Sequence, residues 1–149
     1  MRTIKIPEMK FAKWMRWEER DKYSLKYFPG VYIIAVTNKM LSGKTPSWND
    51  VVYIGMTNSI GGLSNRWRQL DRSINGKFGH SGGKSIYQDL GSYKKWRKSL
   101  YVAAMGIECD VKEPTGKDYI KMGWVAYFEY EAFSQYFKEI GKHPKYNKQ

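Results

Sequence analysis

Two short apolar runs, residues 31–36 and 51–54, constrain the fold of this 149-residue chain more than any other feature. Both runs are rich in β-branched residues, and residues 38–50 between them are rich in Gly, Pro, Ser, Asn and Lys. Such runs, bounded by turn-forming residues, are typical of a β-hairpin with a long loop. Alternate residues of the first run point to opposite faces of the strand, and both sets are apolar. The hairpin is therefore expected to lie inside the domain.

The length and composition favour one domain with a sizeable core. We expect a domain over residues 28–149, with residues 1–27 as a basic extension packed on it and residues 9–21 forming an amphipathic helix. Cys109 is the only cysteine and there are two histidines, which argues against a disulfide framework or a structural zinc site. The sequence shows no signal peptide and no membrane-spanning run, so we expect an intracellular protein, cytoplasmic or nucleoid-associated, with no membrane partner.

The basic residues are concentrated in the middle of the chain. The formal net charge is +12, and residues 62–102 hold nine Lys and Arg against two Asp. Such a surface suits a polyanion, most simply nucleic acid, although solubility or a membrane-surface patch would also explain it. The residues predicted to contact DNA are Arg68, Arg72, Lys77, Lys84, Lys94, Lys95, Arg97 and Lys98.

Residues 63–74 are predicted to form a helix with one apolar stripe, made of Leu63, Trp67, Leu70 and Ile74. Arg66 lies beside this stripe, whereas Arg68 and Arg72 point towards solvent. An arginine at the boundary of the core is either one half of an ion pair or a functional group. Residues 76–85 are expected to form a basic glycine-rich loop, followed by a short helix at 85–90 and a third strand at 100–107.

The last predicted helix covers residues 117–141, with Gly141 as its C-cap. On the helical wheel Glu129 falls in the middle of the apolar stripe, and Glu131 points the other way, into water. A carboxylate on a buried stripe needs a metal, a cation or a proton. A buried ion pair with Arg or Lys is the alternative to a functional role for Glu129.

The order of these segments resembles that of the GIY-YIG nuclease family: Gly30-Val31-Tyr32, Tyr53-Ile54-Gly55, a helix with Arg, a third strand, a helix with Glu, and Pro144 to Asn147 at the end. The resemblance covers roughly residues 28–147. It implies an α/β (α+β) fold, with a small three-stranded antiparallel sheet flanked by helices and, here, an N-terminal helical extension. It also implies hydrolysis of double-stranded DNA with one divalent metal ion, Mg²⁺ or Mn²⁺, bound by Glu129.

The resemblance assigns the catalytic roles to Tyr32, Tyr53, Arg66 and Glu129. Tyr32 would accept the proton of the attacking water, provided that nearby cations lower its pKa, and Tyr53 would position the phosphate. Many members of the family carry His or Tyr one turn after the arginine, where this chain has Leu70. His80 and Tyr87 are candidates to replace that group, and Asn147 is a further auxiliary residue.

A second interpretation follows from the departure at Leu70. The chain is then a nucleic-acid-binding domain of the same fold that has lost catalysis. The sequence leaves open whether the enzyme would serve restriction, homing or repair, and a homodimer is compatible with it.

Overall fold

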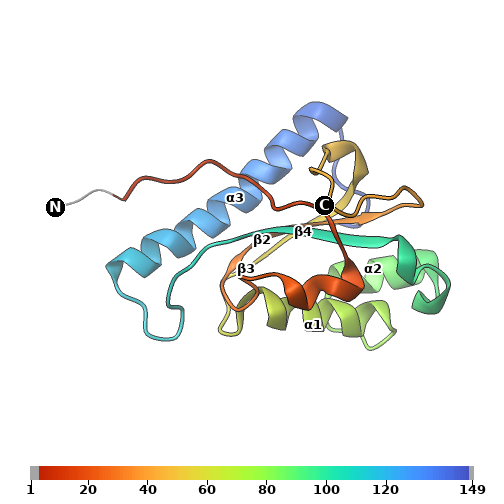
Figure 1. Ribbon diagram of the computed structural model, residues 1–149, viewed down its shortest axis with the longest axis horizontal. Helices are drawn as coiled ribbons and strands as arrows, with labels where there is room; N and C mark the ends of the chain where they lie inside the picture. Colours follow the sequence, from red (N-terminus) through yellow and green to blue (C-terminus); the bar gives the residue numbers. More distant parts are fainter. Residues whose placement is uncertain (1–3, 148–149) are drawn as a thin grey trace.

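A four-stranded antiparallel sheet forms the middle layer of the structure, a computed structural model that describes residues 4–147 (Figure 1). The strands lie in the order β1-β4-β2-β3. Their bounds are β1 Met15–Arg16, β2 Gly30–Val36, β3 Val51–Thr57 and β4 Leu100–Gly106. The predicted α+β class is confirmed, but the prediction of three strands is wrong, because β1 pairs with β4 and adds a fourth.

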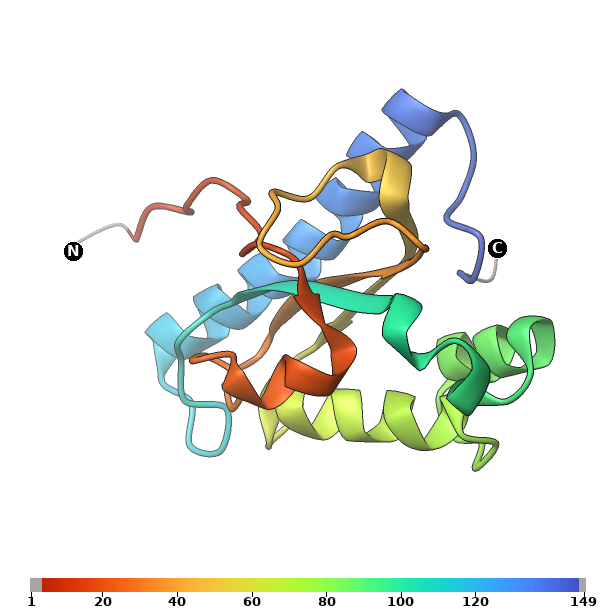
Figure 2. The same cartoon turned by 45° about the vertical axis from the view of Figure 1, so that its right-hand side comes forward.

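Helices cover the two faces of this sheet. Helices α1 (Gly62–Ile74) and α2 (Ser81–Leu90) lie on one side, and α3 (Gly116–Ile140) crosses the other (Figure 2). Gly141 ends α3 in the left-handed region, at φ 84°, as the sequence predicts. Short 3₁₀ segments occur at Trp17–Lys22, Trp48–Asp50, Tyr93–Lys95 and Arg97–Ser99. Within residues 4–147 no helix is long and apolar enough to cross a bilayer.

Side chains of β2 point alternately to the two faces of the sheet and belong to two separate hydrophobic clusters. The cluster on the α3 side contains Val31, Ile33 and Ala35 of β2, which pack with Phe128 and Ala132 of α3. On the other face, Tyr32 and Ile34 pack against α1, whose predicted stripe is fully buried. Both faces of the hairpin are therefore covered, as its all-apolar pattern indicates.

The predicted helix over residues 9–21 is wrong. Residues up to Trp14 are extended, followed by β1 and the 3₁₀ turns of Trp17–Lys22. A helix would place Trp14 and Trp17 on one face, but the chain buries them in the two opposite clusters. The extended backbone also donates hydrogen bonds, from Ala12 N–H to the carbonyl of Ala104 in β4 and from Trp14 N–H to the carbonyl of Lys44 in the loop between β2 and β3.

The glycine-rich loop is shorter than predicted, because α2 begins at Ser81 rather than near residue 85. Gly82 and Gly83, which disfavour a helix by themselves, are both buried within it. A Cβ at Gly82 would overlap the ring of Tyr53, and one at Gly83 would lie 2.5 Å from Cβ of Ser73. Close packing against the neighbouring elements therefore explains these glycines.

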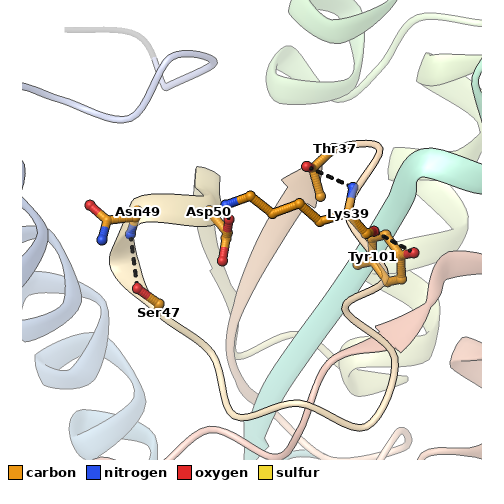
Figure 3. A network of polar contacts seen from close by, with 6 residues as sticks. All are labelled: Thr37, Lys39, Ser47, Asn49, Asp50 and Tyr101. Carbon is orange, nitrogen blue, oxygen red and sulfur yellow. Dashed lines mark hydrogen bonds and ion pairs between the residues drawn. The ribbon is translucent and has the colours of Figure 1, made fainter.

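The long loop between β2 and β3 is held by polar contacts within itself and to β4 (Figure 3). Lys39 Nζ lies 2.9 Å from Asp50 Oδ1, and the Tyr101 hydroxyl donates to the carbonyl of Lys39 at 3.0 Å. Ser47 Oγ accepts from the N–H of Asn49 at the start of the Trp48–Asp50 turn. The loop thus returns the chain to β3 in a defined position.

The C-terminal segment covers the outer edge of β3. The side chain of Asn147 accepts from the N–H of Ile54 at 2.9 Å and donates to its carbonyl at 2.8 Å. Tyr146 N–H bonds to the carbonyl of Val52, and its hydroxyl donates to Asp89 of α2 at 2.6 Å. These contacts tie the end of the chain to the strand that carries Tyr53.

Candidate active site

Tyr32 of β2 and Tyr53 of β3 form the centre of the site. Their rings lie on the α1 side of the sheet, with centroids 6.2 Å apart. Tyr32 faces Gly55 across the strand pair, and a Cβ at Gly55 would come within 2.5 Å of the Tyr32 ring. The glycine of the Tyr-Ile-Gly run is therefore required to admit the tyrosine of the other run.

His80, from the loop before α2, reaches the hydroxyl of Tyr32. It is 1% exposed, and its Nε2 lies 3.1 Å from Tyr32 Oη. Its Nδ1 accepts from the N–H of Gly83 at 3.1 Å, as the N-cap of α2. A backbone N–H can only donate, so Nδ1 carries no proton and Nε2–H donates to Tyr32. Burial and then the charge of Arg66 lower the pKa of His80 from 6.5 to about 4, so the imidazole is neutral near pH 7.

Arg66 is half-buried on α1, as its place beside the apolar stripe predicts. Its guanidinium donates to Gln69 Oε1 at 2.9 Å and favours the ionised form of Tyr32. Burial outweighs this effect, and with the neighbouring Tyr53 it raises the Tyr32 pKa well above 10. The condition that nearby cations lower the Tyr32 pKa below its ordinary value is therefore not met by the side chains of the protein alone.

Glu129 is half-buried on α3, at the edge of the buried stripe rather than in its middle. The centre of the stripe is formed by Val125, Phe128, Ala132 and Tyr136. Burial raises the pKa of Glu129, and Arg66 acts in the opposite direction. The charge of Glu129 in turn raises the pKa of Tyr53, after the larger effect of burial and against the effect of Arg66.

The Glu129 carboxylate makes no ion pair or hydrogen bond with any residue between 4 and 147, which leaves the ion-pair alternative without support. Glu131 is also half-buried rather than fully in water, but its Oε1 accepts from Gln135 at 3.2 Å. The two glutamates therefore differ in environment, as their helical positions indicate.

Three other positions that the sequence singles out do not join the group of Tyr32, Tyr53, Arg66 and Glu129. Leu70 is buried in the cluster beneath α1. Tyr87 packs edge-to-face on Phe78, with ring centroids 5.5 Å apart. Asn147 holds the edge of β3 through its amide. Of the two candidates to replace a group at Leu70, His80 is the one that contacts Tyr32.

Sequence reasoning missed the residues that position these groups. Ser73 is fully buried and accepts from the N–H of His80 at 2.7 Å, and Gln69 holds Arg66. Gly82 makes room for the Tyr53 ring. The only sequence signal for them is their place on the same turns of α1 and α2 as the candidate residues.

The eight predicted DNA-contacting side chains are all exposed. They come from α1, α2, the loop between these helices and the segment that joins α2 to β4, all on one side of the sheet (Figure 1). The two acidic residues of this region are engaged elsewhere, Asp71 with Trp17 and Arg20, and Asp89 with Tyr146 and Lys145. Within residues 4–147, Arg97 is the one member of this set with an ion pair, to Glu18 at 3.8 Å, so most of the basic surface is not neutralised by the protein itself.

The residues present fit a hard divalent ion bound largely through water and substrate. Within residues 4–147 no three His, Cys, Asp or Glu side chains come together, and Glu129 is the candidate carboxylate ligand. Mg²⁺ is commonly bound by one or two carboxylates together with substrate phosphates. An unpaired, half-buried carboxylate such as Glu129 suits that role.

No protein-family model, curated protein or solved structure matches this chain.

Proposed function

We propose that this protein is a metal-dependent endonuclease of the GIY-YIG type that hydrolyses DNA phosphodiester bonds. The observation that carries the proposal is the convergence of Tyr32, Tyr53, Arg66 and Glu129 from four elements, close enough that the charge of Arg66 lowers the pKa of the other three groups and that of Glu129 raises the pKa of Tyr53. The exposed basic surface beside α1 supports a polyanionic substrate.

Each side chain has a defined role in this proposal. Arg66 presents a planar fork of donors to the scissile phosphate and remains charged throughout. Tyr53 donates to a phosphate oxygen. Tyr32 directs a lone pair at the attacking water, while the N–H of His80 stabilises negative charge on its oxygen. A divalent ion held by Glu129 would supply positive charge at the phosphate and the leaving oxygen.

The direction of proton transfer follows from the tautomer of His80. Since Nε2 already carries a proton, His80 cannot take one from Tyr32. Tyr32 must therefore lose its proton to solvent before it can act as a base, and its raised pKa opposes that step. We expect the rate of cleavage to increase with pH above neutrality.

The raised pKa of Tyr32 and the buried Leu70 also favour the second candidate, a DNA-binding domain without catalytic activity. Binding would then use the same basic surface. Nicking of supercoiled plasmid with Mg²⁺, and its loss with a chelator, distinguishes the two functions.

The two glutamates of α3 provide the decisive variants. Glu129→Gln keeps the shape of the side chain and removes the charge that a cation requires, so it should bind DNA and fail to cut at any Mg²⁺ concentration. Glu131→Gln is the matched control and should cut almost normally, because the new amide oxygen can still accept the hydrogen bond from Gln135. Normal cutting by both variants would rule out the proposed metal site. An inactive Glu131→Gln together with an active Glu129→Gln would show that Glu131, and not Glu129, is the metal ligand.

A further inference from the structure

The outward face of α3 exposes several large side chains, of which Phe137 is partly covered by the ring of His143, with ring centroids 5.4 Å apart. Tyr130 is 74% exposed, and Ile120, Tyr127 and Phe137 are each about half exposed. The inward face of the same helix is occupied separately, by the stripe around Phe128 that packs on the sheet. Contiguous exposed apolar surface of this kind marks an interaction site.

The exposed residues follow a heptad pattern. Steps of three and four residues alternate along the helix from position 120 to position 137, and every residue at these steps is exposed. Alternating steps of three and four are the spacing by which one helix packs along another. We define the seam as these six residues: Ile120, Gly123, Tyr127, Tyr130, Ser134 and Phe137.

The seam is complementary to itself when it is reversed. About the point midway between residues 128 and 129, Ile120 corresponds to Phe137, Gly123 to Ser134, and Tyr127 to Tyr130. An antiparallel pair of these helices would place small residues opposite small ones and aromatic residues opposite each other at the centre. Self-complementarity of one surface is what a two-fold symmetric dimer requires.

Charge also favours a second copy of this chain over a nucleic acid on this face. Helix α3 carries three Lys against four Asp and Glu, whereas residues 62–102 carry nine basic and two acidic side chains. Two α3 helices therefore meet without strong repulsion, while the basic surfaces on the other side of each sheet stay free.

We propose that the protein forms a homodimer through an antiparallel pair of α3 helices packed along this seam. Glu129 lies outside the seam, so the dimer does not depend on the nuclease proposal. The dimer would present two copies of the site related by a two-fold axis.

Sedimentation of the full chain across the micromolar range tests the proposal. We expect a monomer–dimer equilibrium that Tyr130→Glu shifts towards monomer by at least tenfold in Kd, because each new charge would be buried against the other copy. Tyr27 is 68% exposed and lies outside the seam, so Tyr27→Glu is the matched control and should leave the dimer intact. A wild-type monomer at every concentration, or equal effects of the two variants, would overturn the proposal.

Cysteine cross-linking tests the antiparallel register. A side chain at Gly123 meets no other atom within 4 Å, so Gly123→Cys is accommodated, and Ser134→Cys is nearly isosteric. Mild oxidation of the two single variants together should give covalent dimers, and each variant alone should give few. The native chain, whose Cys109 is buried, provides the background. Single variants that cross-link as well as the mixture would show parallel pairing and overturn this register.

Discussion

At the scale of single residues, the charge of Glu129 in the proposed site lowers the stability of the folded protein. Burial raises the pKa of Glu129, so folding favours its protonated form. The stability from this group is complete below its unfolded pKa of about 4.5 and is lost as the pH increases through the higher folded pKa. At neutral pH the ionised Glu129 therefore destabilises the native state.

The destabilising effect of ionised Glu129 gives a prediction that can be tested without DNA. Glu129→Gln should unfold at a higher temperature than the wild type at pH 7, and the difference should shrink as the pH approaches 4.5. Thermal unfolding of both proteins at the two pH values measures it. Glu131→Gln, whose carboxylate bonds to Gln135, should show no comparable gain. A destabilised Glu129→Gln at pH 7 would indicate that an unseen partner stabilises this carboxylate.

His80 contributes to stability with the opposite dependence on pH. Its folded pKa is about 4 and its ordinary value 6.5, so its contribution is complete above pH 6.5 and is lost as the pH falls towards 4. The shift corresponds to a contribution on the order of 3 kcal/mol. The carboxyls of Asp89 and Asp118, whose pKa values are lowered from 3.8, act mainly below this range.

His80→Asn separates the capping role from the contact with Tyr32. Asn is a favoured N-cap and can still accept from Gly83, but it has no titrating group. Urea unfolding from pH 7 to pH 4 should show a much flatter loss of stability in the variant than in the wild type. If the enzyme cuts DNA, the variant should also cut more slowly, with the alkaline rise in rate displaced to higher pH. Parallel stability curves would show that His80 is not the group that titrates.

The sequence predicts some of these residues and not others, for physical reasons. The narrow stripe of α1 fixes the direction of Arg66, because only one face of that helix is apolar. Helix α3 has large apolar side chains on both faces, so the wheel places Glu129 at the centre of a stripe that is actually centred on Phe128. The contact of His80 with Tyr32 joins residues 48 positions apart, and no local pattern encodes it.

At the scale of elements, local periodicity identifies β2, β3, α1, β4 and α3 close to their observed bounds. It fails where tertiary packing overrides propensity. The open edge of β4 draws the first residues into an extended pairing that buries Trp14 and Trp17 on opposite faces. Gly82 and Gly83 join α2 because the neighbouring elements leave no room for side chains.

The C-terminal segment provides a prediction at this scale. The side-chain amide of Asn147 forms hydrogen bonds with both the backbone N–H and the carbonyl of Ile54 on the edge of β3, as a neighbouring strand would. Asn147→Ala leaves this donor and acceptor without protein partners, and should lower the free energy of unfolding by about 1–3 kcal/mol. Lys142→Ala, at an exposed position in the same segment, is the control and should change it little. Chemical denaturation measures both, and equal values would mean that water replaces the amide without cost.

At the scale of the whole molecule, the two layers of helices differ in charge. The elements that carry the eight exposed basic side chains lie on one side of the sheet, and the nearly neutral α3 lies on the other (Figure 2). The sequence predicts that a basic surface exists, because most of the net charge falls within residues 62–102. It does not predict that both acidic residues of this region are paired, which depends on contacts with distant segments.

This asymmetry predicts how binding to duplex DNA should depend on salt. Each phosphate contact that is lost should reduce the slope of log K against log salt concentration by about 0.9. Replacing Arg68, Arg72 and Lys95 by Gln together should therefore flatten the slope by up to three such steps. Replacing the exposed Lys117, Lys138 and Lys142 changes the net charge equally on the α3 side and should leave the slope nearly unchanged. Fluorescence anisotropy over a salt series measures both variants, and an equal flattening by both would show that net charge, and not this surface, governs binding.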